Sequence, residues 1–168
     1  MDATRLGVDG SFHTRRLTPE DLDALQDLFE RCRDYFEIAT GVGPRPDESR
    51  HAYVGGPPDK SVNDKRTIGV FSAEDELVGV LDAITNWPAD GVWTMGLLLL
   101  DPERRGAGLG RAVLDAYEHW SSREGARRFH TAVVASHSRG IRFLESMGYA
   151  REGGPGPIAR LSKAAEII

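Results

Sequence analysis

Apolar and polar residues alternate along the chain in blocks that predict a series of strands. Residues 12–17, "FHTRRL", alternate as in a half-buried strand, and residues 66–87 predict two antiparallel strands joined by the turn "AEDE". Residues 92–100, "VWTMGLLLL", end in four leucines, which is typical of a strand buried on both faces near the middle of a sheet. Residues 128–134 and 158–163 predict two further strands.

Apolar residues at helical spacing predict three helices between these strands. A capping Thr and a helix-starting Pro precede residues 20–36, and further helices are expected over residues 108–124 and 138–147. The segment 41–65 is rich in Gly, Pro and charge, and it forms either a short helix with loops or a functional lid. The order β-α-β-β-β-α-β-α-β predicts an α/β fold, a mixed central sheet with helices on its faces.

Length and charge limit the class of protein. With 168 residues, of which 40% are hydrophobic, the chain is long enough for one domain with a core and too short to promise two. Residues 1–168 are therefore expected to form a single domain. The net charge of -5 and the pI near 5.5 argue against a nucleic-acid binder that relies on phosphate neutralisation, and a cationic partner fits better.

Cysteine content and the length of apolar runs exclude further classes. The single cysteine, Cys32, rules out an intramolecular disulfide and leaves a zinc cluster without its usual ligands, so no metal is expected. Cys32 itself is expected to be a small buried side chain on a helix. The start, "MDATRLGVDG", lacks the apolar core of a signal peptide, and the longest apolar run, residues 97–100, is far short of a membrane span. A soluble cytoplasmic protein without a membrane partner is expected.

The stretch "LLLLDPERRGAGLGRAVL" brings a strand end, a bend and a helix start together. Backbone N–H groups without intrahelical partners gather at such a place, and they favour an anion. Gly106, Gly108 and Gly110 let the backbone approach a ligand closely, and Arg105 and Arg111 add charge-assisted contacts to phosphate. A Gly-rich turn with solvated arginines is the alternative.

Two common nucleotide motifs do not fit this bend. A Walker loop requires G-x-x-x-x-G-K-[ST], and no Lys follows these glycines. A dinucleotide fingerprint requires G-x-G-x-x-G in a first βαβ unit, whereas the glycines here follow a hairpin and have G-x-G-x-G spacing. An NTPase and a dinucleotide-binding domain are therefore disfavoured.

Residues 105–110 fit the pattern R-x-x-G-x-G, and with the preceding "LLLLDPE" and the later "SRGIRFLESMGY" they resemble the GNAT superfamily of N-acetyltransferases. The resemblance covers about residues 12–163. It is strongest over residues 92–149, where strand, loop, helix, strand, helix and Gly-aromatic turn arrive in that family's order. The resemblance implies the GNAT-like fold, with helices on both faces of a central mixed sheet, and acetyl-CoA as the cofactor.

In the resembling family, amides of this loop hold the pyrophosphate of acetyl-CoA, and the pantetheine arm pairs with strand backbone where two strands splay apart. By resemblance, Leu98 and Leu100 are the strand partners, and a backbone N–H assigned to Leu100 polarises the thioester carbonyl. The cofactor-binding residues implied are Leu98, Leu99, Leu100, Arg105, Gly106, Ala107, Gly108, Leu109, Gly110, Arg111, His137 and Phe143.

Two departures of the last predicted helix from the family's pattern bear on the chemistry. The motif N-x-x-A-x-x-F-Y-x-x-x-G-F, aligned on Gly148 and Tyr149, places Leu144 where a tyrosine usually protonates the departing thiolate. His137 replaces the asparagine that typically contacts the pantetheine arm, and it is either a substitute donor or a plain helix-capping histidine. A thiol pKa of about 8.5 makes the thiolate a tolerable leaving group without a donor.

Candidates for the base and for acceptor binding come from charged and aromatic residues elsewhere. Asp82 interrupts the apolar strand "LVGVLDAIT", and it is either a base or amine anchor, or a residue that faces solvent or accepts backbone hydrogen bonds. Carboxylates and aromatics on the first helices and strand connections suit an amine, although a solvated helix face explains the acids equally well. The acceptor-binding candidates are Glu30, Asp34, Tyr35 and Trp87.

The sequence thus predicts an N-acetyltransferase that moves an acetyl group from acetyl-CoA to a primary amine of a small molecule or peptide by direct attack. A non-catalytic acyl-CoA-binding or sensory domain is the alternative, favoured by the missing tyrosine. A peptide-binding module without acetyl-CoA would leave the glycine bend unexplained. The sequence leaves open the acceptor, the length of the acyl group and the choice between a monomer and a homodimer.

Overall fold

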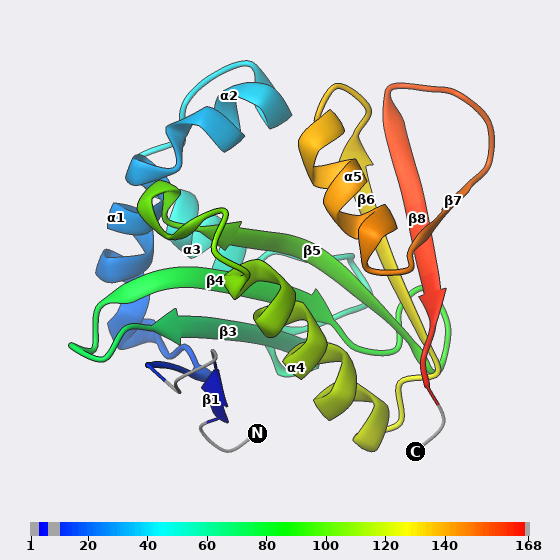
Figure 1. The fold of residues 1–168 in the computed structure, drawn as a ribbon, viewed down its shortest axis with the longest axis horizontal. Coiled ribbons are helices and arrows are strands. Elements are labelled where there is room, and N and C mark those ends of the chain that lie inside the picture. The colour runs from blue at the N-terminus through cyan, green and yellow to red at the C-terminus, as the bar shows by residue number, and fades with distance from the viewer. Residues whose placement is uncertain (1–3, 7–10, 167–168) are drawn as a thin grey trace.

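The computed structural model describes residues 4–6 and 11–166 of the chain. Most of residues 1–10, the stretch that was predicted not to be a signal peptide, lies outside the described residues. Within the described residues, eight strands form one sheet in the order β1-β2-β3-β4-β5-β6-β8-β7 (Figure 1). Neighbouring strands are antiparallel except β5 and β6, which are parallel. A mixed sheet with helices on both faces confirms the predicted fold class.

The strands follow the predicted order, with two additions. The strands are β1 (Thr4–Leu6), β2 (Phe12–Arg16), β3 (Lys65–Phe71), β4 (Leu77–Ile84), β5 (Val92–Leu100), β6 (Arg128–Val134), β7 (Ala150–Glu152) and β8 (Ile158–Ala164). The α-helices are α1 (Leu22–Arg31), α2 (Arg33–Thr40), α3 (Glu48–Val54), α4 (Leu109–Arg123) and α5 (Ser138–Ser146). β5 lies inside the sheet, as its leucines predict. The sequence does not predict β1 and β7, because three residues are too few to show alternation.

Two apolar clusters cover opposite faces of the sheet. Leu81 and Met95 pack with residues of α4 and α5 on one face, whereas Val80 and Leu99 pack with residues of α1 and α2 on the other. Successive strand residues point to opposite faces, so the adjacent Val80 and Leu81 belong to different clusters. Burial on both faces explains why the central strands read as nearly continuous apolar runs.

The helix predicted over residues 20–36 is in fact two helices, α1 and α2, which meet at Cys32. The backbone of Cys32 has φ -97° and ψ 29°, outside the helical region, and its N–H donates to the carbonyls of Leu28 and Phe29. Its side chain is fully buried, and Sγ donates to the Leu100 carbonyl at 3.4 Å. No Gly or Pro marks the bend, so the helical spacing continues through it. The bend carries α2 over the ends of β5 and β6 (Figure 1).

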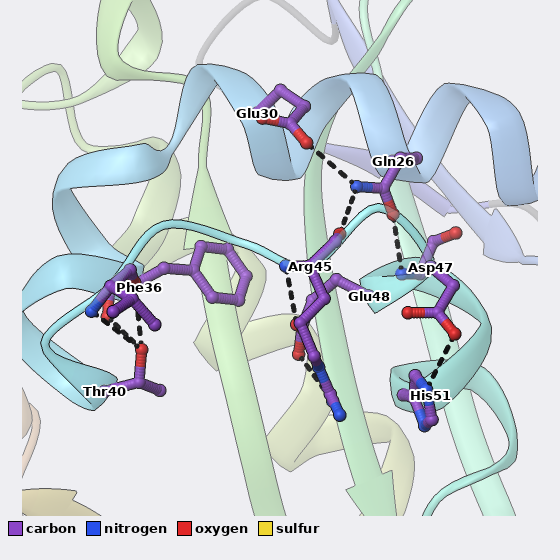
Figure 2. A network of polar contacts seen from close by, with 10 residues as sticks. Gln26, Glu30, Phe36, Thr40, Arg45, Asp47, Glu48 and His51 are labelled. Carbon is purple, nitrogen blue, oxygen red and sulfur yellow. Dashed lines mark hydrogen bonds and ion pairs between the residues drawn. The ribbon is translucent and has the colours of Figure 1, made fainter.

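The segment 41–65 contains the short helix α3 and connecting loops, which confirms the first of its two alternatives. Figure 2 shows how Gln26 on α1 holds this segment. Gln26 Nε2 donates to the Arg45 carbonyl at 2.8 Å, and Gln26 Oε1 accepts from the Ser49 N–H at 2.9 Å. Arg45 also forms an ion pair with Glu48 at 2.9 Å. α3 is therefore fixed against α1 on the α1 face of the sheet.

Candidate active site

The neighbouring strands β5 and β6 pair along only part of their length. The parallel ladder joins Val92–Met95 to Arg128–Thr131. At its last step, Thr131 Oγ1 donates to the Met95 carbonyl at 3.0 Å. Beyond this step the strands separate, and no other strand of the described residues pairs with β5 on that side. The two strands thus splay apart, as the family resemblance implies.

A cavity of about 680 Å³ occupies the gap between the splayed strands. Its walls come from both strand ends, from one face of α2, and from the glycine bend and α5 on the other side of the sheet. The lining residues are Asp34, Tyr35, Ile38, Ala39, Met95, Gly96, Leu97, Leu98, Leu99, Leu100, Arg105, Gly106, Gly108, Gly110, Arg111, Thr131, Ala132, Val133, Val134, Ser136, His137, Ser138, Arg139, Gly140, Phe143, Leu144 and Ile158. Most cofactor candidates and two acceptor candidates therefore meet in one cavity.

The end of β5 offers backbone groups to this cavity. The Asp101 N–H donates to the Val78 carbonyl of the β4 side at 2.8 Å. Backbone groups alternate in direction along a strand, so those of Leu98 and Leu100 point away from β4 and into the gap. The Leu100 carbonyl accepts from Arg105 Nε at 3.0 Å, which confirms that direction. On the side that faces β6, Leu98 has no strand partner among the described residues, and its amide and carbonyl can pair there with an extended ligand.

The glycine bend leaves open space in front of its backbone. Gly106 and Gly108 have φ of +81° and +87°, a region that L side chains rarely adopt, and an added Cβ would meet nothing within 4 Å at either position. Gly108 precedes the first residue of α4, so the amides at this helix start have no side-chain cap. The bend therefore combines free N–H groups with room for a ligand.

Charges at the helix starts also differ between the two faces of the sheet. Among the five described α-helices, α1, α2 and α3 have an acidic residue in the first turn, whereas α4 and α5 have none. Instead Arg111 and Arg139 lie in the first turns of α4 and α5, and both line the cavity. A positive side chain at a helix N-terminus opposes the helix dipole. The two helix starts that border the cavity are thus suited to an anionic ligand.

His137 lines the cavity and also caps α5. Its Nδ1 accepts a hydrogen bond from the Gly140 N–H at 3.3 Å. Burial lowers the pKa of His137, and the neighbouring charges of Arg105 and Arg139 lower it further. A neutral ring with an accepting Nδ1 carries its proton on Nε2. Both predicted roles for His137, cap and donor, are therefore compatible with one tautomer.

An ion pair crosses from the glycine bend to α2. Arg105 Nη1 contacts Asp34 Oδ2 at 2.5 Å, and Nη2 contacts Asp34 Oδ1 at 3.3 Å. The hydrogen bond from Arg105 holds the pKa of Asp34 below its usual range. Because Nε is bound to the Leu100 carbonyl, all three nitrogens of Arg105 have partners. Arg105 was expected to contact phosphate and Asp34 an amine, but here each satisfies the other.

The remaining cavity candidates are aromatic or apolar. Phe143 and Leu144 of α5 line the wall, so the position of the missing tyrosine does face the cavity. Tyr35 lines the cavity from α2, with its ring centroid 6.0 Å from that of His137. Tyr149 is buried outside the lining, and burial raises its pKa far above the usual range. Tyr35 therefore carries the phenol nearest to this site among the lining residues.

Asp82 lies on β4, outside the cavity lining. Its carboxylate accepts from Thr67 Oγ1 at 2.7 Å and forms an ion pair with the buried Lys65 ammonium at 3.1 Å. Lys65 Nζ also donates to the Ala52 carbonyl of α3. Burial raises the pKa of Asp82, and Lys65 and Thr67 partly oppose that rise. The sequence suggested either a base or amine anchor, or a residue that faces solvent or accepts backbone hydrogen bonds. In the structure Asp82 instead contacts the side chains of Lys65 and Thr67.

Four other candidates have side chains away from the cavity lining. Glu30 accepts from Gln26 at 3.1 Å in the network of Figure 2, and it pairs with a neighbouring arginine. Trp87 lies in the connection between β4 and β5, at the opposite end of β5 from the glycine bend. Ala107 is exposed, and Leu109 is buried in the core beneath α4, so neither residue lines the cavity.

Sequence reasoning missed several lining residues. Ile38 and Ala39 follow Asp34 and Tyr35 by four positions, and such pairs share one helix face. The helical spacing was therefore a usable signal for them. Ile158, at the start of β8, enters the lining because β8 pairs with β6, and no local pattern indicates that pairing.

The described residues show neither a metal-binding cluster nor a membrane-spanning helix. In the described part of the chain, no group of three or more His, Cys, Asp or Glu side chains is placed to hold a metal ion. No helix of residues 4–6 and 11–166 combines the length and apolarity needed to cross a membrane. The cytoplasmic location stays a prediction.

A splayed parallel strand pair, a glycine bend with free amides and a cavity between them define an acyl-CoA-dependent acyltransferase. The sequence matches the family model described as Acetyltransferase (GNAT) family over residues 22–149. The chain therefore belongs to the GNAT acetyltransferase family, whose cofactor is acetyl-CoA. No curated protein sequence matches the chain significantly.

Solved structures of other acetyltransferases share the fold. An acetyltransferase from Thermus thermophilus has a TM-score of 0.77 and 24% identity, covering 92% of this chain and 97% of its own. PaiA N-acetyltransferase from Thermoplasma acidophilum, solved with coenzyme A, has a TM-score of 0.71, 17% identity and coverages of 92% and 99%. Spermidine N-acetyltransferase from Vibrio cholerae, solved with CoA and spermine, has a TM-score of 0.72, 18% identity and coverages of 92% and 96%.

The cavity residues fit acetyl-CoA by their own chemistry. Open positive-φ glycines and two arginines suit a pyrophosphate, and the strand edge at Leu98 suits the amides of a pantetheine arm. The narrow end of the gap, where Thr131 closes the ladder, is lined by apolar strand residues. The pyrophosphate and the pantetheine arm of acetyl-CoA thus each meet a part of the cavity wall with complementary chemistry.

Proposed function

We propose that this protein transfers the acetyl group of acetyl-CoA to a primary amine of a small molecule or peptide by direct attack. One observation carries the proposal: a single cavity joins the glycine bend, the splayed strands and the face of α2. Such a cavity places a cofactor and an acceptor on opposite sides of the same gap. Amine attack then requires that both ligands reach the gap together and that the amine has lost its proton to solvent.

The chain's own groups divide the work of binding. Amides of Gly106, Gly108 and Gly110 hold the pyrophosphate, and Arg111 and Arg139 add positive charge. Leu98 pairs with the pantetheine arm, His137 donates from Nε2, and Phe143 packs beside it. When bound, acetyl-CoA supplies an activated acetyl group and a thiol leaving group. The N–H of Leu100 points into the gap and is the donor for the carbonyl oxygen.

Direct attack is supported by the state of the cysteine. Cys32 is the single cysteine of the chain, and it lies outside the cavity lining. Burial raises the pKa of Cys32 to about 11, so its thiol stays protonated near neutral pH. Its Sγ is also bound to the Leu100 carbonyl. An acyl-cysteine intermediate is therefore disfavoured.

A non-catalytic acyl-CoA sensor is the second candidate function. Leu144 faces the cavity at the position where the family usually has a proton-donating tyrosine, and a leucine cannot donate. Binding without turnover is the property that distinguishes a sensor from an enzyme.

The first experiment measures binding and turnover separately. Acetyl-CoA at about 100 times its dissociation constant should stabilise the fold by about 2.7 kcal/mol, seen as a thermal shift. Release of free CoA thiol is then followed with a panel of amines, including spermidine, the acceptor class in the name of one similar structure. Thiol release that depends on an amine supports the enzyme. Binding without release on any amine supports the sensor, and no thermal shift contradicts both.

A further inference from the structure

The acceptor side of the cavity carries very little free negative charge. Asp34 is the sole carboxylate among the described residues that line the cavity. It is held by both terminal nitrogens of Arg105, at 2.5 and 3.3 Å. Arg111 and Arg139 make the remaining charged lining positive. A ligand with two ammonium groups would have no second carboxylate to bind, and burying an unpaired charge is costly.

Other acids near α2 do not change this balance. Glu30 accepts from Gln26 and pairs with Arg33 at 3.4 Å, outside the lining. Asp82 pairs with the buried Lys65, one strand away from the cavity. Glu37, the other exposed acid of α2 after Asp34, also lies outside the lining. Among the described residues, the lining therefore contains no carboxylate other than Asp34.

The same wall exposes apolar side chains to solvent. Ile38 on α2 and Ile158 at the start of β8 are each 45% exposed, and both line the cavity. Tyr35 and Ala39 belong to the same face of α2. Exposed large apolar groups in a concave site mark a place that an apolar ligand surface covers, because covering them removes apolar area from water.

We propose that the acceptor is a small monoamine whose amine is carried on an apolar or aromatic body with no second positive charge. This inference rests on the proposed acetyltransfer. Ile38 and Ile158 contact the apolar body, and Tyr35 faces the amine with an aromatic ring. Asp34 is the sole carboxylate among the described lining residues, so an ammonium group that reaches it shares it with Arg105. Diamines and polyamines are disfavoured, because the described lining has no carboxylate for a second ammonium group.

The first test uses two amines of equal chain length that differ in one ammonium group. Thiol release from acetyl-CoA is measured with 1-aminobutane and with 1,4-diaminobutane, and phenethylamine is included as an aromatic probe. We expect kcat/KM to be at least tenfold higher for 1-aminobutane than for the diamine, and highest for phenethylamine. Equal or better use of the diamine overturns the proposal.

The second test changes the wall. Ile38→Asp adds a carboxylate, so the ratio of diamine to monoamine kcat/KM should rise at least tenfold, while Ile38→Asn should lower use of phenethylamine without helping the diamine. Val42→Asp is the matched control, because Val42 is 64% exposed just beyond α2 and lies outside the lining. Its ratio should match that of the wild type. An unchanged ratio in Ile38→Asp contradicts the assignment of this wall.

Calorimetry with acetyl-CoA alone separates this proposal from the function on which it rests. Acetyl-CoA binding together with transfer to the diamine that is at least as efficient as transfer to 1-aminobutane overturns the monoamine proposal and leaves acetyltransfer intact. If acetyl-CoA binds but neither the three probes nor spermidine receive the acetyl group, the result counts against the proposed function. The monoamine proposal is then contradicted as well.

Discussion

Asp82 and Lys65 form a buried ion pair beside the cavity, linked to Thr67 on β3 and to the Ala52 carbonyl on α3. Side-chain exposure is 4% for Lys65 and 13% for Asp82, so neither charge is well solvated. Breaking such a pair from one side leaves an uncompensated buried charge, which is more harmful than replacing both partners. The first role of Asp82 that the structure supports is therefore to hold β3, β4 and α3 together.

Asp82→Asn should lower the free energy of unfolding by about 3 kcal/mol, because it strands the Lys65 ammonium, while acetyl-CoA affinity stays within twofold of the wild type. Urea denaturation and calorimetry measure the two quantities. Asp115→Asn, an exposed position on α4, is the control. The catalytic hypothesis for Asp82 makes the opposite claim, a turnover loss of about 10²-fold with normal stability, and that result would displace the structural role.

His137 should make stability depend on pH below about pH 6.5. Its folded-state pKa is lowered, mainly by burial, so the unfolded chain takes up this proton more readily than the folded one. The contribution of the neutral ring is complete above the ordinary value of about 6.5 and is lost as the pH falls through the folded pKa. Protonation also removes the Nδ1 acceptor that caps Gly140.

His137→Asn keeps a capping acceptor that does not titrate. The free energy of unfolding of the wild type should therefore fall relative to this variant as the pH drops below 6.5, with all other histidines common to both proteins. Urea unfolding at several pH values measures the difference. Parallel curves for the two proteins would show that His137 does not titrate differently on folding.

Leu144→Tyr should restore a phenol to the cavity wall at the position of the family's usual donor. We expect either a higher turnover or a new alkaline fall in the rate near pH 10, the ordinary range of a tyrosine. Leu144→Phe adds nearly the same volume without the hydroxyl, and it controls for crowding at this 4% exposed position. Identical pH profiles for the Tyr and Phe variants would show that the hydroxyl does not reach the thiol. Tyr149→Phe should leave the profile unchanged.

At the scale of elements, a substitution at the start of α4 can change cofactor binding without lowering the stability of the fold. Gly110 is the second residue of α4, has no positive φ, and an added Cβ would lie 3.6 Å from side-chain atoms of Leu100 and Phe143, an ordinary contact. A Glu there gains helix propensity and complements the helix dipole, yet it faces the proposed phosphate site.

Gly110→Glu should therefore unfold with a free energy equal to the wild type or up to about 1 kcal/mol higher, while acetyl-CoA affinity falls at least tenfold. Gly110→Ala should keep both properties close to the wild type. Urea denaturation and calorimetry give the two values independently. Undiminished affinity in the Glu variant would place the phosphates elsewhere.

Elements with strong local patterns were predictable from the sequence, and those set by tertiary contacts were not. The leucines of β5 and the glycines after it form patterns of neighbouring residues, so the central strand and the bend can be predicted from the sequence. The α1–α2 bend at Cys32 has no Gly or Pro, because burial of a side chain against the Leu100 carbonyl fixes it. The spacing of apolar residues along the chain does not indicate such a contact.

Ion pairs between distant residues were the part of the site that sequence reasoning could not supply. Arg105 and Asp34 were both singled out, but they are 71 positions apart, and only the fold brings them together. The same holds for Asp82, whose apolar surroundings were recognised although its partner Lys65 was not. Sequence chemistry identifies which residues matter, and tertiary structure decides which of their charges remain free.

At the scale of the whole molecule, the cavity passes through the sheet from α2 on one face to the starts of α4 and α5 on the other. The groups proposed to hold the cofactor lie on one side, and the wall proposed to contact the acceptor lies on the other. Substitutions along the α2 face at positions other than Asp34 can therefore accumulate, in evolution or in the laboratory, without disturbing the glycine bend. The Asp34–Arg105 ion pair couples the two sides, so a change of acceptor that recruits Asp34 must also find Arg105 a new partner.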